Sequence, residues 1–424
     1  MPAAALTHIS LCLLLLLYAG ALRACSSSTA RAEPHAGAVP MAAPGGRYST
    51  VWEALKALDV RAAEELGLSG DEAVFARAIE SITGGDPGAA VERLAGLVAA
   101  TADATVRTHA GKVLASLYLA QGRWDDVAAM DVTQDGDVFR AFSRTPPETV
   151  VFPSDAVRLP LSFSRAGNPL VSVLVNGRAR TFFFDTGAGI SVLSAEVAKA
   201  CGVEAIHTSE VEAGTATSRT IRMLPASVEE LRIGEIVFRH HPVMIMRDED
   251  SRLAILGIPV VKIDGIIGWP AIRRMHVVLD FPGKTITLSS VSSQSVAERN
   301  MFEMGAPVIR AITEQGVPLF LGLDTGARRT SLGDGYLRKV AGMDTRPAST
   351  LRGSVGGWEV SRDVAVKQAS LVLGSSILRF SNVRTGFTQP AQFAELDGML
   401  GCDVLAGSVV TIDATQGVFR LVAP

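Results

Sequence analysis

The chain has 424 residues, of which 48% are hydrophobic and 20% are charged, and its formal net charge at pH 7 is −3. This balance is typical of a soluble globular protein that can bury a large core. It excludes the strongly basic composition that nucleic-acid or polyanion binding requires, so we expect no nucleic-acid partner.

The N-terminus is predicted to be a targeting segment. Residues 9–22 are almost wholly apolar, but this run is too short for a comfortable membrane span. It ends at Leu22-Arg23-Ala24-Cys25, which resembles the lipobox of bacterial lipoproteins, where the cysteine becomes the lipidated first residue. The resemblance implies a signal peptide over residues 1–25 and an exported, periplasmic bacterial protein held to the membrane only by a lipid on Cys25. Cleavage after Ala30-Arg31-Ala32 is the alternative, and it would release a soluble periplasmic or secreted protein.

Two further segments precede the second half of the chain. Residues 26–47 are rich in Ser, Ala and Pro and are predicted to be a flexible tether. Residues 48–145 carry apolar residues at helical spacing, which predicts an all-α module that ends at Thr145-Pro146-Pro147. Its helix-pair rhythm is similar to tetratricopeptide-type repeats, and a plain helical bundle is the alternative. Such a module could bind a protein partner, position substrates or act as a spacer.

One motif then occurs twice. Asp185-Thr186-Gly187-Ala188 and Asp324-Thr325-Gly326-Ala327 each follow an apolar run that predicts a buried strand. Apolar-apolar-Gly triplets end at Gly268 and Gly401, which lie 83 and 77 residues after the respective aspartates. Landmarks repeated in the same order indicate a duplicated lobe. Two carboxylates a few ångströms apart cannot both ionise easily, so such a pair shares a proton and can serve as acid and base.

These doubled motifs resemble those of retropepsin-like aspartic proteases, in the single-chain arrangement where two similar lobes replace two identical subunits. The resemblance spans residues 155–424 and implies an all-β acid-protease fold with lobes at 155–292 and 303–424. With the helical module, it predicts a multidomain α+β protein. It implies an aspartic endopeptidase in which Asp185 and Asp324 activate one water against a peptide or protein substrate, with no metal or cofactor. The alternative is a pseudoprotease that binds peptides without cutting them, or an adaptor that works through its helices.

Residues around the two aspartates are expected to support the catalytic loops. Gly187 and Gly326 allow a tight turn and bring amide groups close to the carboxylates. The resemblance implies that Thr186 and Thr325 form hydrogen bonds across the lobe interface. A hydroxyl follows each aspartate by six residues, and we expect these two side chains to brace the loops: Ser191 and Thr330.

Substrate contacts are implied at positions four and five after each aspartate, which line subsites in retropepsins. These positions are Gly189-Ile190 in the first half and Arg328-Arg329 in the second. The difference predicts a cleft with one apolar and one cationic side, and a preference for an acidic residue or a free carboxylate in the substrate. Alternatively, the arginines point outward or pair with acids such as Asp334.

Each half also contains a segment with glycine that is a candidate flap, a hairpin that would close over a bound peptide. Glu212-Ala213-Gly214-Thr215 is the first candidate. The second is the segment 352–358, with Gly356, Gly357 and Trp358 at its end. Ordinary surface turns are the alternative for both.

Other polar residues receive structural interpretations. His240 and His241 are adjacent on a predicted strand and therefore point to opposite faces, which disfavours a metal site with Asp248 and Asp250 and favours surface polarity. Two aspartates recur where an apolar strand meets a turn, and we interpret them as turn formers: Asp280 and Asp413. Cys201 and Cys402 could pair, although Cys402 is better explained as a small core residue.

Overall fold

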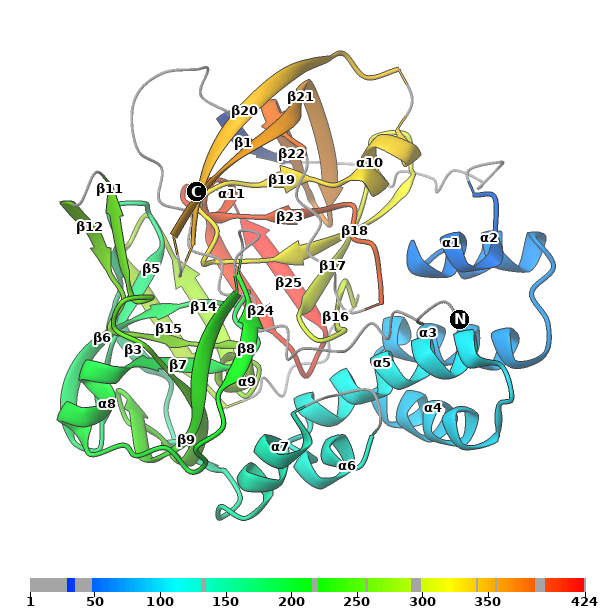
Figure 1. Ribbon diagram of the computed structural model, residues 1–424. Helices are drawn as coiled ribbons and strands as arrows, with labels where there is room; N and C mark the ends of the chain where they lie inside the picture. Colours follow the sequence, from blue (N-terminus) through cyan, green and yellow to red (C-terminus); the bar gives the residue numbers. More distant parts are fainter. Residues whose placement is uncertain are drawn as a thin grey trace.

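The computed structural model describes residues 29–34, 48–130, 135–215, 220–255, 258–290, 299–340, 342–354, 357–385 and 393–422. Over these residues, a helical N-terminal part is followed by a β-rich part made of two lobes (Figure 1). The proposed lipidation residue, Cys25, lies outside the described residues. None of the described helices is long and apolar enough to span a membrane.

The helical part consists of short helices that begin and end at recognisable caps. Asp86 accepts a hydrogen bond from the amide of Ala89, and Pro87 occupies the first turn of the helix that follows. The preceding helix ends at Gly84 and is capped by Gly85, whose φ of 86° favours a residue without a Cβ. The helices are α1 (Val51–Lys56), α2 (Val60–Glu65), α3 (Gly70–Gly84), α4 (Pro87–Ala100), α5 (Ala104–Ala120), α6 (Trp124–Ala128) and α7 (Gly136–Ser143).

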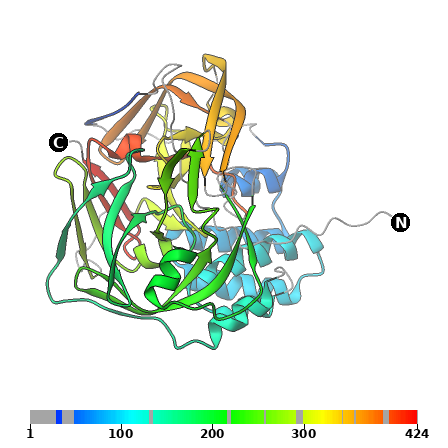
Figure 2. The ribbon, with the colours of Figure 1, turned by 60° about the vertical axis from the view of Figure 1, so that its left-hand side comes forward.

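The helical part shares a hydrophobic core with the second lobe. Phe75 of α3 meets Phe393 with ring centroids 4.8 Å apart, and Trp52 of α1 lies 5.5 Å from Phe75. His109 of α5 joins the same cluster, 5.2 Å from Phe393. Burial and the nearby Lys56 lower the pKa of His109 to about 4. The helices are therefore packed on the β-rich part, along one side of the two lobes (Figures 1 and 2).

The first lobe is a sheet with the strand order β2-β10-β7-β13-β6-β5-β9-β8. Strand β9 also pairs with β10, which curls the sheet into a partly closed barrel, and β4 is added beside β5. Two short helices, α8 (Ala195–Cys201) and α9 (Trp269–Ile272), lie against it. The strands are β2 (Thr149–Val151), β4 (Ser162–Phe163), β5 (Pro169–Val175), β6 (Arg178–Phe184), β7 (Ser191–Ser194), β8 (Val211–Gly214), β9 (Thr220–Ile233), β10 (Ile236–Met246) and β13 (Gly265–Ile267).

The second lobe repeats this topology in the order β1-β22-β19-β23-β18-β17-β21-β20, with β16 added beside β17 and with β21 paired to β22. Helices α10 (Asp334–Lys339) and α11 (Cys402–Leu405) correspond in place to α8 and α9. The strands are β1 (Thr29–Pro34), β16 (Met301–Glu303), β17 (Pro307–Ile312), β18 (Pro318–Leu323), β19 (Ser331–Leu332), β20 (Thr345–Ser354), β21 (Gly357–Leu373), β22 (Ser376–Arg384) and β23 (Gly398–Leu400).

The segment boundaries differ from the predicted ones. The predicted tether, residues 26–47, contains strand β1, which pairs antiparallel with β22 at the edge of the second lobe. In the first lobe, β2 takes the same position beside β10, so this sheet begins before residue 155. In the second lobe, β16 begins at Met301. The composition of residues 26–47 did not reveal strand β1, because an edge strand needs only backbone hydrogen bonds, which a Ser- and Ala-rich segment can supply.

A third sheet joins the lobes. It has five strands in the order β25-β24-β14-β15-β3, namely β25 (Val418–Val422), β24 (Val409–Asp413), β14 (His276–Asp280), β15 (Thr285–Ser289) and β3 (Val157–Pro160). Its central pair joins β14 of the first lobe to β24 of the second. Asp280 and Asp413 end these strands and accept hydrogen bonds from the amides of Gly283 and Gln416, as expected of turn formers. A small hairpin, β11 (Arg252–Ile255) and β12 (Ile258–Lys262), stands apart from these sheets.

Candidate active site

Two equivalent strand ends place Asp185 and Asp324 at the contact between the lobes. Strand β6 runs parallel to β13, and β18 runs parallel to β23. The amide of Asp185 donates to the carbonyl of Ile267 over 3.0 Å, and the amide of Asp324 donates to the carbonyl of Leu400 over 3.0 Å. The same backbone arrangement therefore fixes each aspartate just beyond the end of a buried strand.

Backbone amides hold one oxygen of each carboxylate. The Oδ1 atom of Asp185 accepts from the amide of Gly187 at 2.9 Å. The Oδ1 atom of Asp324 accepts from the amides of Gly326 and Ala327, at 2.8 and 2.9 Å. The Oδ2 atom of each aspartate is buried and has no hydrogen-bond partner within the described part of the chain. These two oxygens are therefore the ones free to bind a water molecule or a substrate group.

The two carboxylates lie close enough to influence each other. A Cβ on Gly187 would come within 2.5 Å of the carboxyl carbon of Asp324, so the turn of the first loop touches the carboxylate of the second. Both side chains are almost completely buried. Burial raises the pKa of Asp185 to about 7 and raises the pKa of Asp324 well above its usual range, where the charge of Asp185 adds to the effect. The pair therefore retains a proton well above the pH at which an exposed aspartate loses it.

Reciprocal threonine contacts bind the two loops together. The hydroxyl of Thr186 donates to the carbonyl of Leu323 at 2.9 Å and accepts from the amide of Thr325 at 3.0 Å. The hydroxyl of Thr325 donates to the carbonyl of Phe184 at 2.5 Å and accepts from the amide of Thr186 at 3.0 Å. The geometry expected from the family resemblance is therefore present in the structure.

We expect Thr325→Val to destabilise the loops while keeping the shape of the side chain. The change removes two hydrogen bonds and leaves the amide of Thr186 and the carbonyl of Phe184 unsatisfied in the interior. Each such group costs about 1–3 kcal/mol. Urea denaturation should show a loss of roughly 2–4 kcal/mol, whereas Thr325→Ser should retain most of the stability. Equal stability of the Val and Ser variants would contradict the importance of these bonds.

The glycines of the apolar-apolar-Gly triplets allow close packing behind the loops. A Cβ on Gly268 would lie 2.6 Å from the carbonyl group of Ile190, and one on Gly401 would lie 2.5 Å from the carbonyl carbon of Arg329. The amide of Gly268 donates to Ser191 at 3.1 Å, and the amide of Gly401 donates to Thr330 at 3.0 Å. Ser191 and Thr330 thus lie where they can brace the two loops.

The two bracing hydroxyls have different partners. Thr330 donates to Asp403 at 2.8 Å, in the residues that follow Gly401. Ser191 instead contacts Nε2 of His241 at 2.8 Å, and Nδ1 of this histidine contacts Glu148. His241 is fully buried, so the expectation of surface polarity was wrong for this residue. His240, by contrast, has a φ of 55° and has no partner in the register between β10 and β9, so it interrupts the regular strand.

Two contacts around the loops were not predicted. Asn168 is buried, and its side-chain amide donates to the carbonyls of Thr325 and Gly326, at 3.3 and 2.7 Å. A first-lobe residue thus fixes the second Asp-Thr-Gly loop, although no motif marks it in the sequence. Cys402 is a buried free thiol whose Sγ contacts the carbonyl of Thr325 at 3.1 Å. Cys201 is also a buried free thiol, so the two cysteines do not pair.

The predicted substrate positions differ between the lobes. Gly189 is exposed, but Ile190 is buried in a cluster that includes Val138 and Phe142 of helix α7. Arg328 and Arg329 are half-buried, and burial raises the pKa of Asp403, an effect that the charge of Arg329 partly opposes. The sequence could not place a helix against Ile190, because that contact joins residues far apart in the chain.

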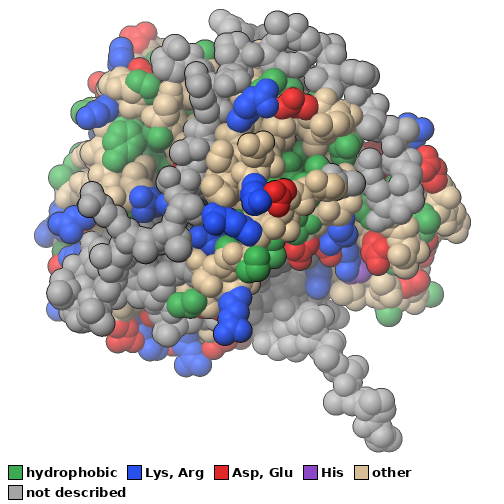
Figure 3. Space-filling view, turned by 90° about the horizontal axis from the view of Figure 1, so that it is seen from above, with side chains coloured by type: hydrophobic (Ala, Val, Ile, Leu, Met, Phe, Trp, Pro, Cys, Tyr) green, Lys and Arg blue, Asp and Glu red, His purple; other side chains and the backbone are tan. Residues whose placement is uncertain are grey.

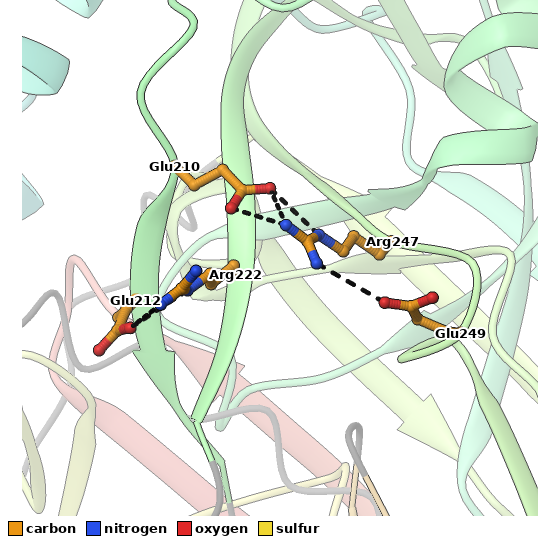
Figure 4. Close-up of polar contacts among 5 residues, drawn as sticks. All are labelled: Glu210, Glu212, Arg222, Arg247 and Glu249. Atoms are coloured by element: carbon orange, nitrogen blue, oxygen red, sulfur yellow. Dashed lines mark hydrogen bonds and ion pairs between the residues drawn. The ribbon is translucent and has the colours of Figure 1, made fainter.

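Both candidate flaps are arms of antiparallel hairpins. Strand β8 pairs with β9 and ends at Gly214. Glu212 and Arg222 face each other across this hairpin at 3.1 Å, and Arg247 at the end of β10 binds Glu210 at the start of β8 (Figure 4). The first pair thus joins the two strands of the hairpin, and the second links the hairpin to the end of β10. Exposed pairs of this kind contribute little to stability but favour one orientation of the strands.

The second candidate flap is the longer hairpin of β20 and β21, at the top of Figure 1. Gly357 and Trp358 open β21, whereas Gly356 lies outside the described residues. Val360 is 68% exposed on this hairpin. The same side of the molecule carries Lys and Arg side chains interspersed with Asp and Glu and with uncharged side chains (Figure 3). Among the described residues, no cluster of His, Cys, Asp or Glu could hold a metal ion.

This chain is similar to known proteins in two comparisons, one with a family model and one with a crystal structure. Residues 171–262 match the family model described as "gag-polyprotein putative aspartyl protease". A crystal structure of a retropepsin-like aspartic protease from Rickettsia conorii is similar at 16% sequence identity and a TM-score of 0.25, over 34% of this chain and 97% of the other. A search of curated proteins found no match.

Proposed function

We propose that this retropepsin-like chain is an aspartic endopeptidase that hydrolyses peptide bonds with Asp185 and Asp324. One observation carries the proposal: two equivalent Asp-Thr-Gly loops meet at the lobe contact, where Gly187 touches the carboxylate of Asp324. Two buried carboxylates with raised pKa values are costly to a folded protein, and a shared proton gives them a chemical use. The substrate is a peptide or a protein, as the family likeness implies.

The geometry supports a mechanism in which both carboxylates act on one water. The Oδ2 atoms of Asp185 and Asp324 hold this water, and the ionised carboxylate takes its proton as the water oxygen attacks the peptide carbonyl carbon. The protonated carboxyl donates to the carbonyl oxygen. The C–N bond then breaks as the amine nitrogen receives a proton from the pair. The pair titrates as a unit, so neither aspartate has a fixed role.

The test is to incubate the protein with a peptide library at pH values between 3 and 8 and to identify the cleavage products by mass spectrometry. We expect cleavage that increases as the pH rises towards about 7, because Asp185 then ionises and supplies the base, while its charge helps Asp324 to keep the proton that the pair shares. Peptide binding without cleavage at any pH would favour the pseudoprotease alternative. Cleavage that persists in Asp185→Asn would place the chemistry elsewhere in the chain.

We also propose that the protein is exported and lipidated at Cys25. The motif Leu22-Arg23-Ala24-Cys25 and the apolar run before it support this proposal. Expression in a Gram-negative bacterium with radiolabelled palmitate should label the wild-type protein in the membrane fraction. Cys25→Ser should abolish the label, and a wild-type protein that stays soluble and unlabelled would support cleavage after Ala32 instead.

A further inference from the structure

A cavity of about 430 Å³ lies between the helical module and the first lobe. Its walls come from the end of α5, from α6 and α7, from residues 145–148 that lead into β2, and from α9. Glu303 and Gly305 of the second lobe complete the enclosure. Pockets at such junctions of structural units are common positions for ligands.

The cavity adjoins the first catalytic loop. Gly189 and Ile190 form part of its wall, and they follow Asp185 by only four and five residues. Ile190 belongs to the same buried cluster as Phe142 of α7, so this cluster connects the loop to the helical module. An extended peptide that binds at Asp185 and passes Gly189 would reach the helical module.

Aromatic side chains form the surface that the helical module presents to this cavity. The ring of Trp124 stacks on Phe142 with centroids 4.8 Å apart, and it lies 6.4 Å from Phe139 in a nearly parallel arrangement. All three rings line the cavity. Trp124 is half-buried, so part of its ring remains open to a bound group.

Several charged groups in the wall are paired with each other. Arg273 lies 2.7 Å from Glu303, and Arg123 lies 2.8 Å from Asp126. Glu148 contacts the ring of the buried His241. Asp125 and Arg274, of opposite charge, are the other charged side chains of the wall, and the three rings make an apolar group a better fit to this cavity than a charged one.

We propose that the cavity is a substrate subsite completed by the helical module, in which Trp124 selects a large apolar or aromatic side chain of the peptide. The subsite uses residues of α6 and α7 that lie outside the two lobes, and so gives the helical module a role in specificity. This inference rests on the proposed peptidase function. Trp124 is a specificity-determining residue here and takes no part in the chemical step.

The experiment compares wild type with Trp124→Ala on a peptide library that varies one position at a time. For peptides with Phe, Trp or Leu at a single position near the cleaved bond, kcat/KM should fall about tenfold or more in the variant. Peptides with Ala or Ser at that position should change less than twofold. Trp52→Ala is the matched control, since Trp52 is in the same module but packs on Phe75, away from the cavity. It should leave the preference unchanged.

A second variant keeps the test decisive if Trp124→Ala does not fold. Ser143→Phe places a large side chain in the cavity wall, and it should likewise remove the advantage of large apolar residues. Cleavage that depends on both aspartates but shows the same preference in wild type, Trp124→Ala and Ser143→Phe would overturn the subsite and leave the peptidase intact.

If the wild type cleaves nothing, the peptidase proposal fails and the subsite is judged by binding. Titration calorimetry with Phe-containing and Ala-containing peptides then measures affinity directly. Tighter binding of the Phe-containing peptide that disappears in Trp124→Ala would support the subsite, and equal affinities would reject it.

Discussion

Asp185→Asn and Asp324→Asn should each reduce peptide cleavage by at least about 1,000-fold, because an amide can neither take the proton of the attacking water nor share one with its partner. The same changes should increase stability at neutral pH. Measurements of kcat/KM and of urea denaturation on the same preparations test both effects. A variant that loses activity and stability together would indicate misfolding of the loop instead.

The stability effect has a definite dependence on pH. An unfolded aspartate loses its proton near pH 4, whereas burial raises the pKa of Asp185 to about 7 and raises the pKa of Asp324 well above its usual range. In wild type, the free energy of unfolding should therefore fall as pH rises through this window, since the unfolded state releases a proton that the folded state still holds. The free energy of unfolding of the Asn variants should depend much less on pH in this window. Their advantage over wild type should be about 1–4 kcal/mol at pH 7 and should vanish near pH 3.

Lys339→Met should destabilise the second lobe by about 3–5 kcal/mol, because it removes the partner of a buried carboxylate. The ammonium of Lys339 lies 2.7 Å from Asp397, and the two side chains are 4% and 0% exposed. Burial already raises the pKa of Asp397, an effect that Lys339 partly opposes. Without this lysine, the carboxyl group must be ionised and unpaired or must take up a proton. Urea denaturation at pH 7.5 should show the loss.

Two further variants separate the effect of the buried Lys339–Asp397 pair from that of an exposed ion pair. Lys367→Met breaks an ion pair with Asp344 that is equally short, at 2.6 Å, but its side chains are 52% and 67% exposed. It should change stability by less than about 1 kcal/mol. Adding Asp397→Asn to Lys339→Met should recover part of the loss, since no buried charge then remains. Similar losses from Lys339→Met and Lys367→Met would contradict this explanation.

Features that depend on local sequence were predictable. The two Asp-Thr-Gly motifs indicated tight turns after buried strands, and Asp185 and Asp324 do lie at such turns. The spacing to Gly268 and Gly401 indicated two similar lobes, and the two sheets have the same strand order. These predictions succeeded because the geometry of a turn and of a parallel strand pair restricts which residues can occupy it.

Features that depend on contacts between distant segments were not predictable. The helical module shares aromatic packing with Phe393, and no local pattern in either segment reveals the other. The same holds for Ile190. An apolar residue at a predicted subsite position could equally well have been exposed to the substrate, and only the structure shows that it is buried. His241 was misread because a histidine's polarity suggests the surface, whereas Ser191 and Glu148 satisfy both of its ring nitrogens in the interior.

The central claim is that one chain supplies both aspartates of a complete site, and mixing two inactive variants tests it most directly. Asp185→Asn and Asp324→Asn proteins are combined in equal amounts, unfolded and refolded together, and assayed for peptide cleavage beside refolded wild type. Our account predicts full inactivity of the mixture, because each chain joins its own two loops through Thr186 and Thr325. Recovery of a substantial fraction of wild-type activity would show that the site forms between two chains and would contradict the account.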